Sequence, residues 1–179
     1  MNKKNSVEEI TIIQGCILME SKSQELLYKK YFGYVMAISL NYISNRELAQ
    51  EIVNDTFMKV FDSIDKFDMT KPFKGWLRRI TINTAIDSLR KNKKFRDHLE
   101  IFDDASQTMS IESVDQLAIE DIHKIISNLP DLLRVVFVLY EIEGYTHKEI
   151  SKRLNIPEGS SRAYLTKAKI RLRSLIVGS

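Results

Sequence analysis

The segment "EISKRLNIPEGSSRAYLTKAKIRLR" at residues 149–173 predicts two short helices separated by Asn-Ile-Pro. Asn155 tolerates the left-handed backbone that often ends a helix, and Pro157 suits the first turn of the next helix. Apolar residues recur at helical spacing on both sides of this turn: Ile150 and Leu154, then Leu165 and Ala168. The pattern is that of a helix-turn-helix, although a plain hairpin of two helices would share it.

Charge helps to separate these two interpretations. Residues 147–173 contain eight lysines and arginines against two glutamates, a net charge of +6. This excess favours DNA contact, because a helix-turn-helix normally places its second helix in the major groove. The N-terminal residues of that helix approach the bases, so Arg162 is the candidate for a bidentate bond to guanine, whereas Ser160 and Ser161 discriminate little. Lys167 lies further along and is expected to contact phosphate.

Three amphipathic helices are predicted earlier in the chain, at about residues 23–43, 46–64 and 73–94. Asn45 is expected to cap the second, and Pro72 prevents its continuation. The core-facing residues of the three helices are, in order, Leu26, Leu27, Tyr31, Val35, Ile38 and Tyr42; Leu48, Ala49, Ile52, Val53, Phe57, Val60, Phe61 and Ile64; Trp76, Leu77, Ile80, Ile86 and Leu89. With six glycines, three prolines and no strict alternation, the sequence predicts an all-α fold.

The distribution of charge predicts a domain boundary. Residues 66–96 hold ten basic and two acidic side chains, whereas residues 97–122 hold eight acidic and no basic ones. The stretch "DDASQTMSIES" lacks apolar periodicity and is rich in serine, as is typical of a mobile connector. Apolar periodicity resumes at Val114. We therefore predict two small helical domains with a flexible acidic linker between them: residues 1–96, 97–113 (the linker) and 114–179.

Basic residues also gather on the predicted helix at residues 73–94. Trp76 lies at a core-spaced position, so packing is a simpler interpretation of it than a stacking platform for a base. Arg78 and Arg79 could form a solvated face, but beside Lys71 and Lys74 they make a stripe suited to a phosphate backbone. A solvated helix end and DNA contact are equally open for the last basic residues of the C-terminal helix: Lys169, Arg171 and Arg173.

The sequence contains no pattern typical of an enzyme. Cys16 is the only cysteine and the three histidines are scattered, so neither a disulfide nor a metal site is expected. A GxxxxGK[ST] phosphate loop and a GxGxxG motif are both absent. Glu47, Glu51 and Asp55 share one helix face, but no facing ligands are evident. Docking of a basic partner is therefore the better interpretation of this acidic face.

The sequence also predicts a protein of the cytoplasm. Glu8 and Glu9 stand where a signal peptide would need its apolar core. The longest uncharged run, residues 31–45, is interrupted by polar side chains and falls short of the roughly 20 apolar residues that span a bilayer. No membrane insertion is expected, and a single cysteine fits a reducing compartment.

Taken together, these segments resemble a bacterial RNA polymerase sigma factor of the extracytoplasmic-function (ECF) subfamily, over about residues 13–173. "QELLYKKYFGYVMAISLNYI" and "ELAQEIVNDTFMKVFDSIDKF" resemble the first two helices of region 2. "FKGWLRRITINTAIDSLRK" resembles the promoter-melting helix, and "LPDLLRVVFVLYEIEGYTHKEISKRLNIPEGSSRAYLTKAKIRLR" resembles region 4. A linker in place of a folded region 3 is typical of this subfamily.

The resemblance implies a function and a set of partners. Such a protein would bind core RNA polymerase, direct it to the −10 and −35 promoter elements and promote DNA melting. It would need no cofactor and no small-molecule substrate, and it would catalyse no covalent reaction. Region 2 would bind the clamp helices of the polymerase β′ subunit, and region 4 would hold the β flap through its apolar surface. An anti-sigma factor is a further expected partner, because one holds most members of the subfamily inactive.

The resemblance also implies which residues form each surface. The β′ clamp helices would contact the acidic helix: Glu47, Glu51, Asn54, Asp55 and Phe57. A loop that captures a flipped base, together with the helix after it, would read and melt the −10 element: Phe67, Asp68, Met69, Thr70, Lys71, Phe73, Arg78, Arg79 and Asn83. The recognition helix would contact the −35 element: Ser160, Ser161, Arg162, Ala163, Thr166 and Lys167.

The recognition helix departs from the pattern "EGTVRSRL", which is commoner in the subfamily. Ser160 and Ser161 replace Thr-Val, and Ala163 and Tyr164 replace Ser-Arg, so the −35 sequence is left undefined. Two other functions stay open at this point. One is a stand-alone helix-turn-helix regulator that dimerises on a palindromic site, and the other is an interaction protein that only sequesters a partner. An enzyme is the least favoured alternative.

Overall fold

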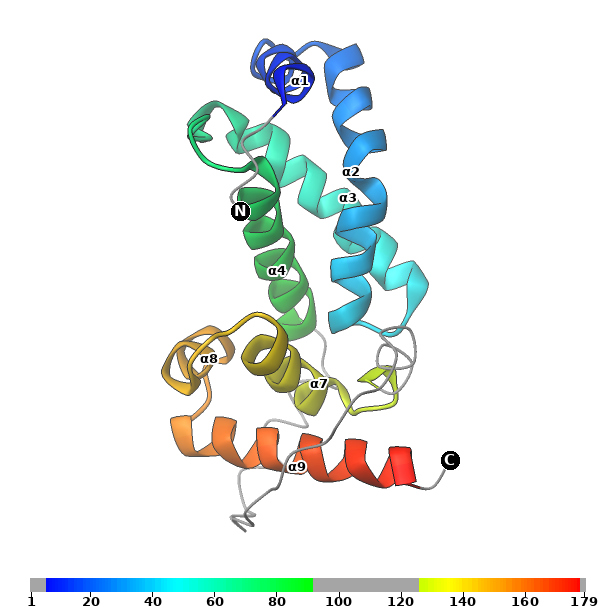
Figure 1. Cartoon of the computed structure of the whole chain (residues 1–179), viewed down its shortest axis with the longest axis vertical. Helices are drawn as coiled ribbons and strands as arrows, with labels where there is room; N and C mark the ends of the chain where they lie inside the picture. The colour runs from blue at the N-terminus through cyan, green and yellow to red at the C-terminus, as the bar shows by residue number, and fades with distance from the viewer. Residues whose placement is uncertain (1–5, 92–125, 178–179) are drawn as a thin grey trace. The chain divides into compact units, whose positions relative to one another are not determined.

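The computed structural model describes residues 6–91 and 126–177, with the backbone alone for residues 175–177. All regular elements in these ranges are helical and none is a strand, which confirms the all-α prediction (Figure 1). In chain order they are α1 (Val7–Ile17), α2 (Ser21–Tyr42), α3 (Arg46–Ser63), η1 (Ile64–Lys66), α4 (Phe73–Lys91), α7 (Asp131–Phe137), η3 (Val138–Ile142), α8 (His147–Leu154) and α9 (Glu158–Val177). The predicted linker and the apolar repeat from Val114 to residue 125 lie outside the described residues.

Contacts between residues divide the chain into two compact units. The first unit combines Met1–Leu40 with Asn45–Ala85, and the second combines Asn41–Ser44 with Ile86–Ser179. The last residues of α2 and α4 thus group with the second unit, although both helices begin in the first. The predicted linker limits stay a prediction.

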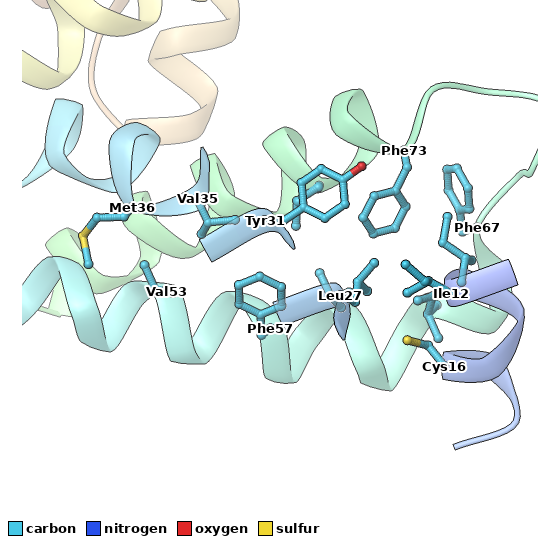
Figure 2. Close-up of a cluster of buried hydrophobic side chains, with 14 of the residues drawn as sticks. Ile12, Cys16, Leu27, Tyr31, Val35, Met36, Val53, Phe57, Phe67 and Phe73 are labelled. Carbon is cyan, nitrogen blue, oxygen red and sulfur yellow. The ribbon is translucent and has the colours of Figure 1, made fainter. Parts of the chain in front are cut away.

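The first unit has an apolar core to which α1, α2, α3 and α4 all contribute (Figure 2). Leu27 and Val35 of α2 meet Val53 and Phe57 of α3 in this core, and each of these side chains is at most 2% exposed. Burying one such side chain contributes about 1.5–3 kcal/mol relative to leaving it in water. The partly buried rings and side chains that pack against the core are Tyr28, Phe32, Tyr34, Leu40, Phe61, Met69, Trp76 and Ile80.

Two predicted core positions are wrong. Leu26 is 45% exposed and Leu48 is 38% exposed. Adjacent residues of a helix point about 100° apart, so the neighbour of each takes the buried position. Leu27 and Ala49 are both fully buried.

Helix α1 is absent from the prediction above, whose first helix begins at residue 23. The Ser6 hydroxyl caps it by accepting a hydrogen bond from the Glu9 backbone N–H at 3.2 Å. Ile13 and Cys16 of this helix enter the core. Burial raises the pKa of the Cys16 thiol to about 11, so it stays protonated at neutral pH and serves as a small apolar side chain.

Capping residues fix several helix ends, and two of them, Asn45 and Asn155, are at predicted positions. The Asn45 side chain accepts a hydrogen bond from the Leu48 N–H at 2.9 Å at the start of α3. Thr146 and Glu149 form a reciprocal capping box at the start of α8. Asn155 ends α8 with a φ of 55°, which is the left-handed backbone predicted for it, and Gly144 has a φ of 73°.

The second unit contains α7, η3, α8 and α9. The apolar run "VVFVLY" predicts a helix after Pro130, and the structure forms it as α7 followed by the π-helical turn η3. The backbone N–H of Glu143 donates to the Val138 carbonyl at 3.0 Å across this wider turn. The apolar faces predicted for the helix-turn-helix are confirmed, because all four residues are buried: Ile150, Leu154, Leu165 and Ala168.

A buried arginine, Arg134, holds the start of α7 in place. Its side chain is 3% exposed and lies 3.3 Å from the Asp131 carboxylate. The guanidinium donates hydrogen bonds to carbonyl oxygens of the preceding segment: Ile126 at 3.2 Å, Ser127 at 2.9 Å and Leu129 at 2.6 Å. Burial lowers the pKa of Arg134, and Asp131 opposes that shift. Arg134 therefore ties three carbonyl groups of the preceding segment to the start of α7.

Candidate nucleic-acid interface

The predicted polymerase-binding residues lie on one exposed face of α3, which we call the acidic face: Glu47, Glu51, Asn54 and Asp55. Spacings of three and four residues place them on successive turns of this helix. The Asn54 side-chain oxygen accepts hydrogen bonds from the Tyr28 hydroxyl at 3.1 Å and from Gln50 at 3.3 Å. The Asn54 amide oxygen is therefore turned toward these neighbours.

Phe57 does not reach this surface. Its side chain is 2% exposed and its ring centroid lies 4.6 Å from that of Tyr28 in the core, so it supports the acidic face from below. Met58, which is not among the predicted residues, is 63% exposed. It follows Asn54 by four residues and so lies one turn further along the same side of α3. Its helical spacing from the acidic residues is the signal that could have identified it.

The base-capture loop is predicted at residues 67–73 and comprises residues 67–72 in the structure, because α4 begins at Phe73. Aromatic packing holds it at both ends. Phe67 and Phe73 are 6% and 0% exposed, and their ring centroids lie 5.3 Å apart in an edge-on arrangement (Figure 2). Trp76 lies 5.2 Å from Phe67 and 5.6 Å from Phe73. The aromatic residues thus serve as anchors, which favours packing as the role of Trp76. Between the anchors Asp68, Thr70 and Lys71 are exposed, and Met69 is half-buried.

The basic stripe continues from this loop onto α4. Lys74 and Arg79 are exposed, while Arg78 and Asn83 are half-buried. The Lys74 ammonium lies 5.5 Å from the centroid of the Tyr34 ring, and the Tyr34 hydroxyl donates to the Lys74 carbonyl at 3.4 Å. Tyr34 therefore fixes the first turn of α4 to α2. The last basic residues of this run, Lys93, Lys94 and Arg96, lie outside the described residues.

The six residues predicted to contact the −35 element have different exposures on α9. The Arg162 side chain is 62% exposed and forms an ion pair with Glu158, one turn earlier on the same helix. Ser161 is fully buried, and its hydroxyl lies 3.0 Å from Nδ1 of His147. The other predicted residues are half-buried: Ser160, Ala163, Thr166 and Lys167. Arg162 thus lies at the surface, whereas the buried Ser161 joins α9 to the start of α8. We call this contact the joint between α8 and α9.

His147 is a residue of this joint that the predicted set does not contain. Its ring stacks on that of Tyr140, with centroids 4.4 Å apart and an interplanar angle of 23°. Burial lowers the pKa of His147, and the positive charge of Arg162 lowers it further, against the opposing effect of Glu158. The neutral imidazole is therefore the form that the folded second unit favours.

We expect the second unit to lose stability as the pH falls. The unfolded chain binds a proton at His147 below the ordinary pKa of 6.5, whereas the folded unit takes up that proton only at lower pH. The contribution of the neutral ring is fully present above about 6.5 and is lost as the pH falls below that value. Urea unfolding at pH 7.5 and 5.5 checks this: the wild type should lose more stability than His147→Gln, and equal losses would refute it.

Two general properties of the described residues bear on function. No group of three or more His, Cys, Asp or Glu side chains in this part of the chain could hold a metal ion. No described helix is both long enough and apolar enough to cross a bilayer.

Comparisons with known proteins match both units. The family model "Sigma-70 region 2" matches residues 27–95, and "Sigma-70, region 4" matches residues 119–172. The ECF RNA polymerase sigma factor SigM of Bacillus subtilis is 30% identical over 154 residues, which cover 83% of this chain and 92% of SigM. SigW of the same organism is 30% identical over 155 residues, which cover 80% of this chain and 83% of SigW. Among solved structures, CnrH in complex with the cytosolic domain of CnrY aligns with a TM-score of 0.49 at 18% identity, covering 94% of this chain and 97% of that one.

Proposed function

This chain belongs to the ECF RNA polymerase sigma factors, which direct core polymerase to promoters and promote melting, and we propose how its residues divide that work. Region 2 comprises residues 1–96, the linker residues 97–113 and region 4 residues 114–179. Region 2 binds core polymerase and the −10 element, and region 4 binds the −35 element. The protein acts in the cytoplasm, where the polymerase is found, and an anti-sigma factor regulates it.

The acidic face of α3 binds the β′ clamp helices in this proposal. Glu47, Glu51 and Asp55 are exposed on successive turns, so their charges can attract a basic partner over some distance. Met58 adds an exposed apolar side chain to the same side of the helix. Phe57 contributes by packing beneath this face, since its side chain has almost no surface of its own.

The loop at residues 67–72 and the start of α4 bind the −10 element. The exposed polar residues of the loop can contact a base that has left its stack. Lys74 and Arg79 on α4 can bind the phosphates beside it, and Arg78 and Asn83 lie on the same helix. Phe67 and Phe73 hold the ends of the loop in the core. One observation supports this proposal most directly: the loop buries its aromatic anchors and exposes its polar residues.

The second unit offers one surface to DNA and another to the β flap. Arg162 lies four residues after the start of α9 and is the most exposed of the predicted base-contacting residues. Apolar side chains are exposed on η3 and α9, where the Lys169 ammonium and the Glu141 carboxylate lie 2.6 Å apart and join the two elements. The residues proposed for the flap are Tyr140, Ile142 and Ile170, with 36%, 41% and 49% exposure.

Arg162→Ala is expected to weaken binding of the holoenzyme to promoter DNA by roughly 1–3 kcal/mol and to relax the preference at one −35 position. A bidentate bond to guanine is lost in this variant, while the ion pair with Glu158 is exposed and contributes little to stability. Gel-shift titrations on promoters with each of four bases at each −35 position measure both effects. Arg171→Ala, a matched charge loss further along α9, should lower affinity uniformly. If Arg162→Ala does the same, Arg162 binds phosphate and is not the base reader.

A further inference from the structure

Asp68 holds the exposed part of the loop at residues 67–72 in a tight turn. Its Oδ1 accepts hydrogen bonds from the backbone N–H of Thr70 at 3.0 Å and from the Thr70 hydroxyl at 2.6 Å. Its Oδ2 lies 3.3 Å from Nζ of Lys71, and its carbonyl oxygen accepts from the Lys71 N–H at 2.9 Å. With Phe67 and Phe73 buried at the two ends, these bonds give the loop a defined shape before any DNA binds.

The same bonds fix the direction in which the Thr70 hydroxyl donates. Its hydrogen bonds to Asp68 lower the pKa of that carboxyl group, and Lys71 lowers it further, so Asp68 is ionised at neutral pH. An ionised carboxylate has no proton to give, and a hydroxyl has only one. The Thr70 proton therefore points to Asp68. Thr70 is exposed, and the side of its oxygen that faces away from Asp68 presents lone pairs alone.

We propose that Asp68 is a positioning residue that makes Thr70 select adenine or cytosine by the amino group on the major-groove side of these bases. The amino group of guanine lies on the other, minor-groove side of the base. This inference rests on the proposed role of the loop in capturing a base of the −10 element. Adenine and cytosine carry an amino group at the ring position where guanine and thymine carry a carbonyl oxygen. An oxygen that can only accept binds the amino group and repels the carbonyl. The ring N–H of guanine or thymine lies beside that carbonyl, so it is not the group that faces the Thr70 oxygen.

Base discrimination by the holoenzyme tests the proposal. The probes are promoter fragments whose −10 region is unpaired, with each of four bases placed in turn at each −10 position of the non-template strand. The wild-type holoenzyme should prefer adenine and cytosine over guanine and thymine about three- to tenfold at one position, the value of one hydrogen bond. Unpaired fragments separate base selection from the cost of melting.

Four variants separate positioning from general damage to the loop. Thr70→Ser should keep the preference, and Thr70→Val should lose it with the hydroxyl. Asp68→Asn can still form the turn, but its amide can donate to the Thr70 oxygen and release the hydroxyl proton to the base. This variant should therefore bind all four bases within about twofold of one another. Asp65→Asn, the same change at an exposed residue of η1 just before the loop, should behave as the wild type.

The outcomes distinguish failure of this inference from failure of the proposed function. A preference for guanine or thymine, or a preference that Asp68→Asn and Thr70→Val leave intact, overturns the inference while base capture by region 2 stands. If the wild type shows no base preference at any −10 position, or no loop variant alters binding to any fragment, the proposed role of the loop is wrong as well.

Discussion

Asp55→Arg is expected to weaken binding to core polymerase by roughly 2–4 kcal/mol, which is about thirty- to several-hundredfold in Kd. Asp55 is exposed at the C-terminal end of the acidic face, one turn after Glu51 and one turn before Met58. A positive charge there would face the basic partner that this surface is proposed to bind. Arginine is a good helix former, so α3 itself should remain folded.

The measurement is a titration of labelled protein with core enzyme at two salt concentrations. Glu25→Arg is the matched control, because it reverses a charge on the exposed side of α2, where the carboxylate pairs with Lys29 at the surface. That variant should bind core polymerase almost as the wild type does. Equal affinities for Asp55→Arg and the wild type would remove the acidic face from the polymerase interface.

Arg134→Met is expected to destabilise the second unit by roughly 2–4 kcal/mol. Methionine fills a similar volume, but it removes all the hydrogen bonds that the guanidinium donates to carbonyl oxygens of the segment before α7. The loss should be smaller than the sum of the separate bonds, because the variant no longer buries a charge. Arg134→Lys should recover only part of the loss, since an ammonium group cannot reproduce the planar fork of donors.

Urea unfolding followed by circular dichroism measures this effect, with Arg171→Met as the exposed control that should stay within about 0.5 kcal/mol of the wild type. A lower free energy of unfolding in Arg134→Met would show that the hydrogen bonds of Arg134 outweigh the cost of burying its charge. A variant as stable as the wild type would mean that the cost of burying Arg134 equals the gain from its hydrogen bonds. Arg134 would then no longer explain how the start of α7 is held.

Much of the fold follows from local signals in the sequence. Asn45, Thr146 and Asn155 act as caps because their side chains or backbone preferences suit a helix end in any context. The helical faces were predicted well where one apolar residue stood alone on its turn. They failed at Leu26 and Leu48, where two apolar residues are adjacent and only the packed structure decides which one is buried.

The burial of Ser161, Phe67 and Phe73 could not be predicted from the sequence, because it depends on contacts made only in the folded chain. From the sequence, Ser161 is expected to be a polar surface residue. It can be buried because His147, fourteen residues earlier, is a hydrogen-bond partner for its hydroxyl. The sequence places Phe67 and Phe73 in or beside a loop where they could contact a base. In the structure both are buried, and both rings pack against Trp76. The π-turn η3 has no periodic signal, since it differs from an α-helix by one residue in one turn.

The family was predicted correctly because its motifs occur in order along the chain. The matches to region 2 and region 4 confirm it, and they count against a stand-alone regulator, which would need no polymerase-binding region. Each DNA-binding region of a sigma factor can bind its promoter element weakly by itself. When one chain holds both regions on the polymerase, their high effective concentration raises the overall affinity.

Transcription from a randomised promoter library with core polymerase tests whether this protein directs the polymerase to promoters. We expect start sites that appear only when this protein is present, on templates that share two sequence elements separated by a fixed spacer. Arg162→Ala should alter the preference in the upstream element, and Asp68→Asn should alter it in the downstream one. Absence of protein-dependent start sites, or binding to a palindrome without polymerase, would contradict the account.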